Sequence, residues 1–362
     1  MTNTTEWITR SVSRLRSGAP STDKAPKASK PAADKPLADK QVADGAATKV
    51  PAPRSTHERL QATLRRGNES LSPRALRRLL ADLQDVVAPQ VSELEGGRRA
   101  QVVAGWYGQA EPEERRDMWL LLCEQFAPDA TRFQSARQRY EAAAGTADEG
   151  QAEISLRRAL VSPRTRLMQR FAVFPEGMRF LVDLRAELLP QLKSDKRLVA
   201  LDADLEHLFT TWFDVAFLEL RRLSWDSPAS LIEKLIKYEA VHDIRSWADL
   251  KNRLDSDRRC YGFFHPRLPN EPLIFVEVAL VDRISDSITP LLDEAAAPCD
   301  ISKATTAIFY SISNTQTGLR GVSFGDSLIK HVVETLKQEF PRLRTFATLS
   351  PIPGLRSWLG KN

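Results

Sequence analysis

Cysteine is scarce in this sequence, and long apolar runs are missing. The three cysteines, Cys123, Cys260 and Cys299, are odd in number, far apart and without a CxxC pair. This pattern argues against a disulfide framework or a metal site and favours a reducing compartment. No uninterrupted apolar stretch approaches the roughly 18 residues that a membrane-spanning helix needs. We therefore expect no metal and no membrane partner.

A net charge of one sign is missing from most of the chain. Residues 1–56 carry ten Lys or Arg and five Asp or Glu, which accounts for the whole formal charge of +5. The remaining residues carry 42 basic and 42 acidic side chains. Because basic and acidic side chains are equal in number after residue 56, we expect no nucleic-acid partner. With 42% hydrophobic and 27% charged residues, the composition is that of a globular protein.

The first 56 residues differ in composition from the rest. Residues 31–45 read PAADK, PLADK and QVADG, a near-repeat that is too poor in apolar side chains to offset the entropy of ordering. We predict a disordered tail over 1–56. The early arginines and serines also fit a cleaved organelle transit peptide, although Glu6 and four aspartates interrupt the basic pattern. The expected location is cytoplasmic, with a mitochondrial one as the alternative.

Residues 57–211 have the periodicity of a helical bundle. Ser72 and Pro73 form a helix start, after which leucines recur on one face, and Ser162-Pro163 repeats this signal. The run from Phe180 to Leu188 keeps the helical period until Pro190 stops it. Nothing in this half has a catalytic pattern. We predict a helical domain that serves homo-oligomerisation.

From residue 212 the pattern is mixed. Alternating or apolar runs predict strands, and amphipathic runs with start signals predict helices. The predicted strands cover 217–224, 259–265, 273–280, 307–313 and 345–349, with helices over 226–238, 244–253 and 326–340. The last two strands and the helix between them form a crossover unit, so these strands should be parallel. Ligands of such sheets bind at the carboxyl ends of the strands.

Two features converge on that end of the predicted sheet. The loop 318–326 contains three glycines and Arg320, and the free N–H groups of the following helical turn attract phosphate. Ser350 precedes Pro351, which favours an extended backbone at the end of the last strand. The alternative is that the glycines are structural and that Ser350 merely terminates its strand.

The second half resembles the malonyl-CoA decarboxylase family in three segments. These are HPRLPNEPLIFVEVALV (265–281), FYSISNTQTGLRGVSFGDSLIKHVVETLKQEFP (309–341) and FATLSPIPGL (346–355). In the helical half, EGMRFLVDLRAELL (176–189) is similar to the same family. The resemblance implies an α+β multidomain protein in which a helical bundle precedes an α/β domain of the GNAT acyltransferase fold. The GNAT loop pattern is partly met, because Gly321 and Ser323 fit it but Gly318 stands where Gln or Arg is usual.

The resemblance also implies a reaction and a site. The reaction converts malonyl-CoA to acetyl-CoA and CO₂, a carboxy-lyase activity of fatty-acid metabolism that needs no metal and no organic cofactor. Ser350, in the SPIPG motif, is implied to be the catalytic serine, and Ser311, in the SIS motif, is implied to support the site. The residues implied to bind the pantetheine–pyrophosphate part of CoA are Arg320, Gly321, Val322, Ser323, Phe324, Gly325 and Asp326.

The sequence departs from the family at one point. The family's general acid is a histidine in a segment beyond SPIPG, whereas this sequence ends at Asn362. We therefore expect a C-terminally truncated GNAT-like domain over 212–362 that binds malonyl-CoA but turns it over poorly. None of the five histidines present substitutes convincingly for the general acid, and His265, in a strand-to-turn segment that could approach the site, is the first to test. The alternative function is a non-catalytic CoA-binding or oligomerising fragment. An acetyltransferase is a third reading, although no acceptor-side base is evident.

Overall fold

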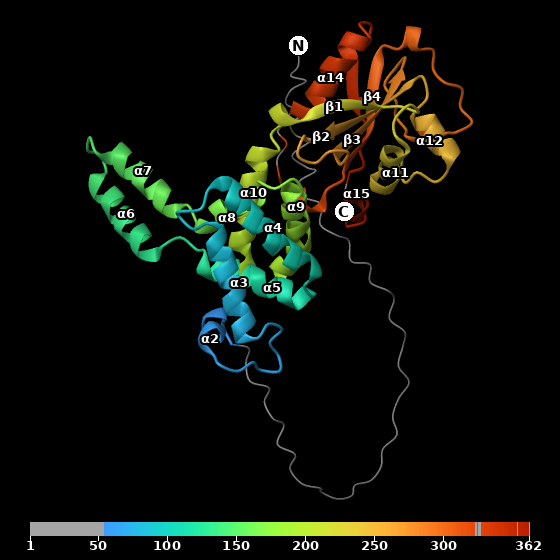
Figure 1. Cartoon of the computed structure of the whole chain (residues 1–362). Coiled ribbons are helices and arrows are strands. Elements are labelled where there is room, and N and C mark those ends of the chain that lie inside the picture. Colours follow the sequence, from blue (N-terminus) through green and yellow to red (C-terminus); the bar gives the residue numbers. More distant parts are fainter. Residues whose placement is uncertain (1–53, 323, 325–326, 353, 362) are drawn as a thin grey trace, which may run out of the picture.

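The computed structural model describes residues 54–322, 324, 327–352 and 354–361 (Figure 1). The predicted disordered tail therefore lies almost entirely outside the described residues. Ser55, inside that predicted tail, caps the first described helix, because its hydroxyl accepts the Glu58 N–H at 3.2 Å.

The N-terminal half is helical, as the sequence predicts. Its helices are α2 (Thr56–Gln61), α3 (Pro73–Val86), α4 (Glu93–Gln109), α5 (Pro112–Gln125), α6 (Ala130–Ala143), α7 (Glu149–Leu160), α8 (Pro163–Phe171), α9 (Gly177–Leu188) and α10 (Val199–Trp212), with 3₁₀ turns η2 (Leu189–Lys193), η3 (Lys196–Leu198) and η4 (Val215–Phe217). The predicted start of α3 is confirmed, since the Ser72 hydroxyl accepts the Ala75 N–H. Helices α6 and α7 form a hairpin that projects from the bundle (Figure 1).

The C-terminal half is built on a five-stranded mixed sheet. Its strands are β1 (Glu219–Leu223), β2 (Arg258–Phe264), β3 (Pro272–Val281), β4 (Thr306–Asn314) and β5 (Thr345–Thr348), in that spatial order. Its helical elements are α11 (Ala229–Tyr238), α12 (Trp247–Arg253), α13 (Thr289–Leu292), η5 (Ile301–Lys303), η6 (Thr317–Leu319), α14 (Ser327–Glu339) and α15 (Leu355–Leu359). The pairs from β1 to β4 are antiparallel, and β4 and β5 are parallel. The predicted fold class and the parallel crossover are thus confirmed; the short helices α13 and α15 were not predicted.

One hydrophobic core connects the two halves. The sheet face formed by residues such as Val276, Val278 and Phe309 packs with Val332 and Leu336 of α14, in the same cluster as the leucines of α3 to α10. The opposite face packs with α11, α12 and α13 in two smaller clusters. The helical half therefore supports the sheet directly.

A β-bulge interrupts the pairing of the two central strands. Glu277 pairs with Ser311, but the next residue, Val278, pairs with Phe309, so Tyr310 is the extra residue. Tyr310 packs with Ala279, on the face that carries α13. The bulge thus turns two consecutive residues, Tyr310 and Ser311, away from α14.

A chain of buried charges ties α12 to the sheet. Arg253 donates from Nη1 to Glu277 Oε2 (3.0 Å) and from Nε to Asp249 Oδ1 (2.7 Å). Glu277 is fully buried and Arg253 is 1% exposed. Burial raises the pKa of Glu277 to about 7, the neighbouring Glu239 carboxylate adds to the rise, and Arg253 opposes it. Glu277 is therefore structurally hydrogen-bonded.

Glu277→Gln should flatten the pH dependence of stability. The carboxyl has an ordinary pKa of 4.5 and a folded-state pKa of about 7. Its contribution to the free energy of unfolding is therefore fully present below pH 4.5 and is lost as pH rises through about 7. Relative to the wild type, the variant should gain on the order of 2–3 kcal/mol of unfolding free energy over this range. Urea unfolding at several pH values measures this difference. The exposed Glu233→Gln variant serves as the control, and a difference that does not change with pH would contradict the prediction.

Candidate functional site

The loop that follows β4 is anchored by buried side chains on either side of an exposed turn. Leu319 and Val322 are buried, and Phe324 packs against the main core. Between them, Arg320 and Gly321 are exposed. Gly321 has φ +84°, a left-handed conformation that glycine adopts without strain. The turn therefore presents backbone rather than side chain at Gly321.

Helix α9 lies directly beneath this loop. A Cβ atom on Gly318 would lie 1.9 Å from the Val182 carbonyl oxygen, so glycine is required there for close packing. The sequence left open whether the loop glycines allow the approach of a ligand or are structural; for Gly318 the structure gives a packing reason. Arg179 of α9 also donates from Nη1 to Gln316 Oε1 at 2.6 Å.

The strongest tie between α9 and the loop is Arg185. Its side chain is 1% exposed, and Nη1 donates to the carbonyls of Gly318 (2.9 Å) and Arg320 (2.8 Å). The sequence prediction did not include Arg185 as a site residue. The available signal was its place in the family-like segment EGMRFLVDLRAELL (176–189).

The residues predicted to bind CoA are described only in part. Ser323, Gly325 and Asp326 lie outside the described residues. Val322 and Phe324 direct their side chains into the core. Of the described members of the set, Arg320 and Gly321 remain exposed to a ligand.

Ser350 lies just past the end of β5 and is exposed. The last ladder bond before it runs from the Leu349 N–H to the Phe309 carbonyl at 2.9 Å. Phe309 and Thr348 are the last paired residues of the two strands, and Ser311 and Ser350 each follow by two positions. The two predicted serines thus share one end of the parallel pair, next to the loop that leaves β4.

Ser311 is held by a buried carboxylate. Its hydroxyl donates to Glu239, with oxygen–oxygen distances of 2.7 and 2.8 Å, and the Ser313 hydroxyl donates to the same group at 3.1 Å. Glu239 is 7% exposed and also accepts the N–H groups of Val241 and His242. These hydrogen bonds hold the bulged strand against the segment that follows α11. Glu239 was not predicted, because it follows the end of α11 in a segment with no catalytic pattern.

His265 and His331 each contact an aromatic ring of another element. His265 is buried, its Nδ1 accepts the Arg267 N–H (3.1 Å), and its ring centroid lies 4.9 Å from that of Phe213. Burial lowers the pKa of His265. His265 is therefore a packing residue at the junction between α10 and the sheet. His331 contacts Phe263.

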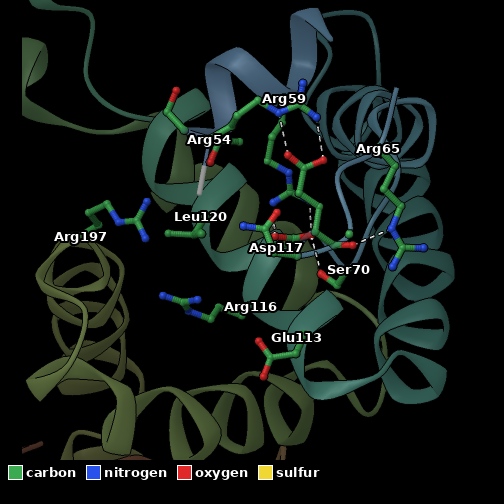
Figure 2. A pocket seen from close by; sticks show the side chains of 14 residues that line it. Arg54, Arg59, Arg65, Ser70, Glu113, Arg116, Asp117, Leu120 and Arg197 are labelled. Atoms are coloured by element: carbon green, nitrogen blue, oxygen red, sulfur yellow. Dashed lines mark hydrogen bonds and ion pairs between the residues drawn. The ribbon is translucent and has the colours of Figure 1, made fainter. Parts of the chain in front are cut away.

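A hollow of about 570 Å³ lies in the helical half, away from the sheet (Figure 2). It is lined by several arginines, four of which have carboxylate partners. Arg59 pairs with Asp117, Arg54 pairs with Glu69, and Arg116 and Arg197 both pair with Asp195. The hollow is therefore the site of an ion-pair network. In the described part of the chain, no cluster of three or more His, Cys, Asp or Glu residues is arranged to hold a metal ion.

Two family models match consecutive parts of the chain. The model of the malonyl-CoA decarboxylase N-terminal domain matches residues 126–213. The model of the malonyl-CoA decarboxylase C-terminal domain matches residues 216–362. The boundary between them coincides with the change from helices to sheet, since α10 ends at Trp212 and β1 begins at Glu219.

The chain is similar to mitochondrial malonyl-CoA decarboxylases of animals. It is 38% identical to the mouse protein (Mus musculus) over 274 residues, which cover 73% of this chain and 56% of the relative. It is 42% identical to the goose protein (Anser anser anser) over 209 residues, which cover 56% of this chain and 42% of the relative. The chain thus spans about half the length of the curated relatives it matches.

Solved structures show the same likeness in three dimensions. A malonyl-CoA decarboxylase from Rhodopseudomonas palustris superposes with a TM-score of 0.70 at 43% identity, covering 79% of this chain and 69% of that one. A malonyl-CoA decarboxylase from Agrobacterium vitis superposes with a TM-score of 0.72 at 39% identity, covering 78% of this chain and 68% of that one. These matches extend over both the helical half and the sheet, and on this basis the chain belongs to the malonyl-CoA decarboxylase family.

Proposed function

We propose that this chain provides the CoA-binding site and the catalytic serine of a malonyl-CoA decarboxylase, a carboxy-lyase that converts malonyl-CoA to acetyl-CoA and CO₂. The observation that carries the proposal is that two features lie past the carboxyl ends of the neighbouring strands β4 and β5. The exposed turn at Arg320 and Gly321 follows β4, and Ser350 follows β5, which runs parallel to β4. Ligands of α/β sheets bind at the carboxyl ends of the parallel strands. Family membership supports the choice of substrate.

In this proposal the loop binds the nucleotide end of the substrate. The backbone at Arg320–Asp326 donates N–H groups to the pyrophosphate, and the Arg320 guanidinium adds positive charge. The close approach of the backbone is supported by the positive φ of Gly321, where a side chain is absent.

The chemistry depends on the thioester. When the carboxylate leaves as CO₂, the electrons of the broken C–C bond move to the thioester carbonyl, which becomes an enolate. A proton from water is then added to carbon. This electron acceptor belongs to the substrate, so the proposal includes no metal and no organic cofactor. Ser350 donates a hydrogen bond to the departing carboxylate and orients it. Backbone N–H groups where β4 and β5 separate stabilise the enolate oxygen.

The helical half is proposed to form a homo-oligomer. Support comes from apolar side chains left exposed on and after the projecting hairpin: Ile154 is 44%, Leu160 52% and Val161 62% exposed. No described helix is long and apolar enough to cross a membrane. The proposed location is cytoplasmic, with a mitochondrial location as the alternative, which the names of the animal relatives support.

Replacing Ser350 tests the proposed function. Ser350→Ala should reduce decarboxylation of malonyl-CoA by about 10²- to 10³-fold, because a donor aimed at the reacting group is lost. The dissociation constant for CoA, measured by calorimetry, should stay unchanged. Ser256→Ala, which removes a hydroxyl at an exposed turn before β2, is the matched control. Unchanged turnover in Ser350→Ala would refute the role of the serine. Failure of the wild-type chain to bind CoA would refute the proposed function and favour the oligomerising alternative.

Replacing Gly321 tests the placement of the pyrophosphate. Gly321→Val should weaken CoA binding by about 10- to 100-fold, since a β-branched residue disfavours φ +84° and each charge-assisted hydrogen bond that is lost costs ~1.5–3 kcal/mol. Gly145→Val is the matched control, because Gly145 also has positive φ (+73°) but lies in the open turn between α6 and α7. Equal CoA affinity in the two folded variants would contradict the placement.

A further inference from the structure

The contact between Arg185 and the loop after β4 has a consequence for ligand binding. Arg185 is buried in α9, and one of its terminal nitrogens, Nη1, donates to the carbonyls of both Gly318 and Arg320. Burying a guanidinium costs desolvation free energy unless hydrogen-bond acceptors and opposite charges surround it. These two carbonyls therefore have a strong preference for pointing toward α9.

The direction of the Arg320 carbonyl determines the direction of the next N–H group. No peptide bond of the described chain is cis, and in a planar trans peptide the N–H points opposite to the preceding C=O. Because the Arg320 carbonyl points toward Arg185, the Gly321 N–H points away from α9. The neighbouring N–H groups of Arg320 and Val322 donate to the carbonyls of Thr317 and Leu319. Within the described residues, the Gly321 N–H has no acceptor, and Gly321 is exposed.

Arg185 also controls the charge beside this N–H group. Its Nε donates to Asp202 Oδ1 at 2.8 Å, and its Nη2 lies 3.4 Å from Glu206 Oε2. Glu206 is the nearest side chain to Gly321, since a Cβ built on Gly321 would lie 3.6 Å from Glu206 Oε1. Without Arg185, both carboxylates would lose this partner, and the Glu206 carboxylate beside Gly321 would repel an anionic ligand.

We infer that Arg185 is a positioning residue of the CoA site: it aims the Gly321 N–H outward at the pyrophosphate and neutralises the carboxylates behind the loop. This inference rests on the proposed function for the identity of the ligand. It makes helix α9 of the helical half part of the binding site, although Arg185 itself does not touch the ligand.

The test compares two arginine variants in the full chain. Arg164 is the matched control, because it is also buried and also donates to two carbonyls, those of Leu122 and Cys123, and to one carboxylate, Asp204. Both Arg185→Gln and Arg164→Gln should lower the melting temperature. Only Arg185→Gln should raise the dissociation constant for CoA, by about tenfold or more, as expected for one charge-assisted hydrogen bond. Arg185→Lys, which keeps the charge but not the planar fork, should bind with intermediate affinity and keeps the test available if the Gln variant does not fold.

Two further readouts separate positioning from general stability. Arg185→Gln should raise KM for malonyl-CoA with little change in kcat, because the pyrophosphate bond is made equally in the ground and transition states. Malonyl-pantetheine, which lacks the pyrophosphate, should be turned over equally by the variant and the wild type. Glu206→Gln, which removes a carboxylate near Gly321, should tighten CoA binding.

The outcomes distinguish this inference from the proposed function. If the wild type does not bind CoA, the proposed function fails. If the wild type binds CoA and the folded Arg185→Gln variant binds it equally well, the inference alone is overturned. An equal loss of affinity in Arg185→Gln and Arg164→Gln would also overturn it, because the effect would then follow from stability rather than from the position of the loop.

Discussion

The close packing of helix α9 against the loop after β4 is the contact on which the candidate site depends. Gly318 allows the Val182 carbonyl to lie where a side chain would otherwise be, and Arg185 bonds the carbonyls on either side of the turn. Contacts with α9 of the helical half therefore fix the conformation of the loop. The same hydrophobic core runs from the bundle into the sheet, so the two halves are packed as one unit.

A second constraint acts on the strand beside the loop. The bulge at Tyr310 turns Ser311 toward Glu239, whose carboxylate also fixes Ser313 and the backbone after α11. Ser350 lies at the same end of the sheet, past the parallel strand β5. One side of the candidate site is thus held by a buried carboxylate and the other by a buried guanidinium.

Much of the fold could be predicted from local patterns. The five strands, the Ser-Pro helix starts and the crossover between β4 and β5 are all encoded within short segments, and each was confirmed. The supports of the site were not predictable in this way. Arg185 lies 133 residues before Gly318, and Glu239 lies 72 residues before Ser311, so no periodicity links the partners. Gly318 shows the same limit, because glycine patterns do not reveal whether the close neighbour is a ligand or a helix. The roles of Ser350 and of Arg320–Asp326 in binding and catalysis stay predictions.

Amide hydrogen exchange with and without CoA is the most direct measurement of the central claim, that the exposed turn beside β4 binds CoA and is supported by α9. The account predicts that CoA slows exchange in peptides covering the Thr317–Val322 turn, with additional protection in α9 and little change around the arginine-lined hollow of the helical half. Protection confined to that hollow, with none in the turn, would contradict it.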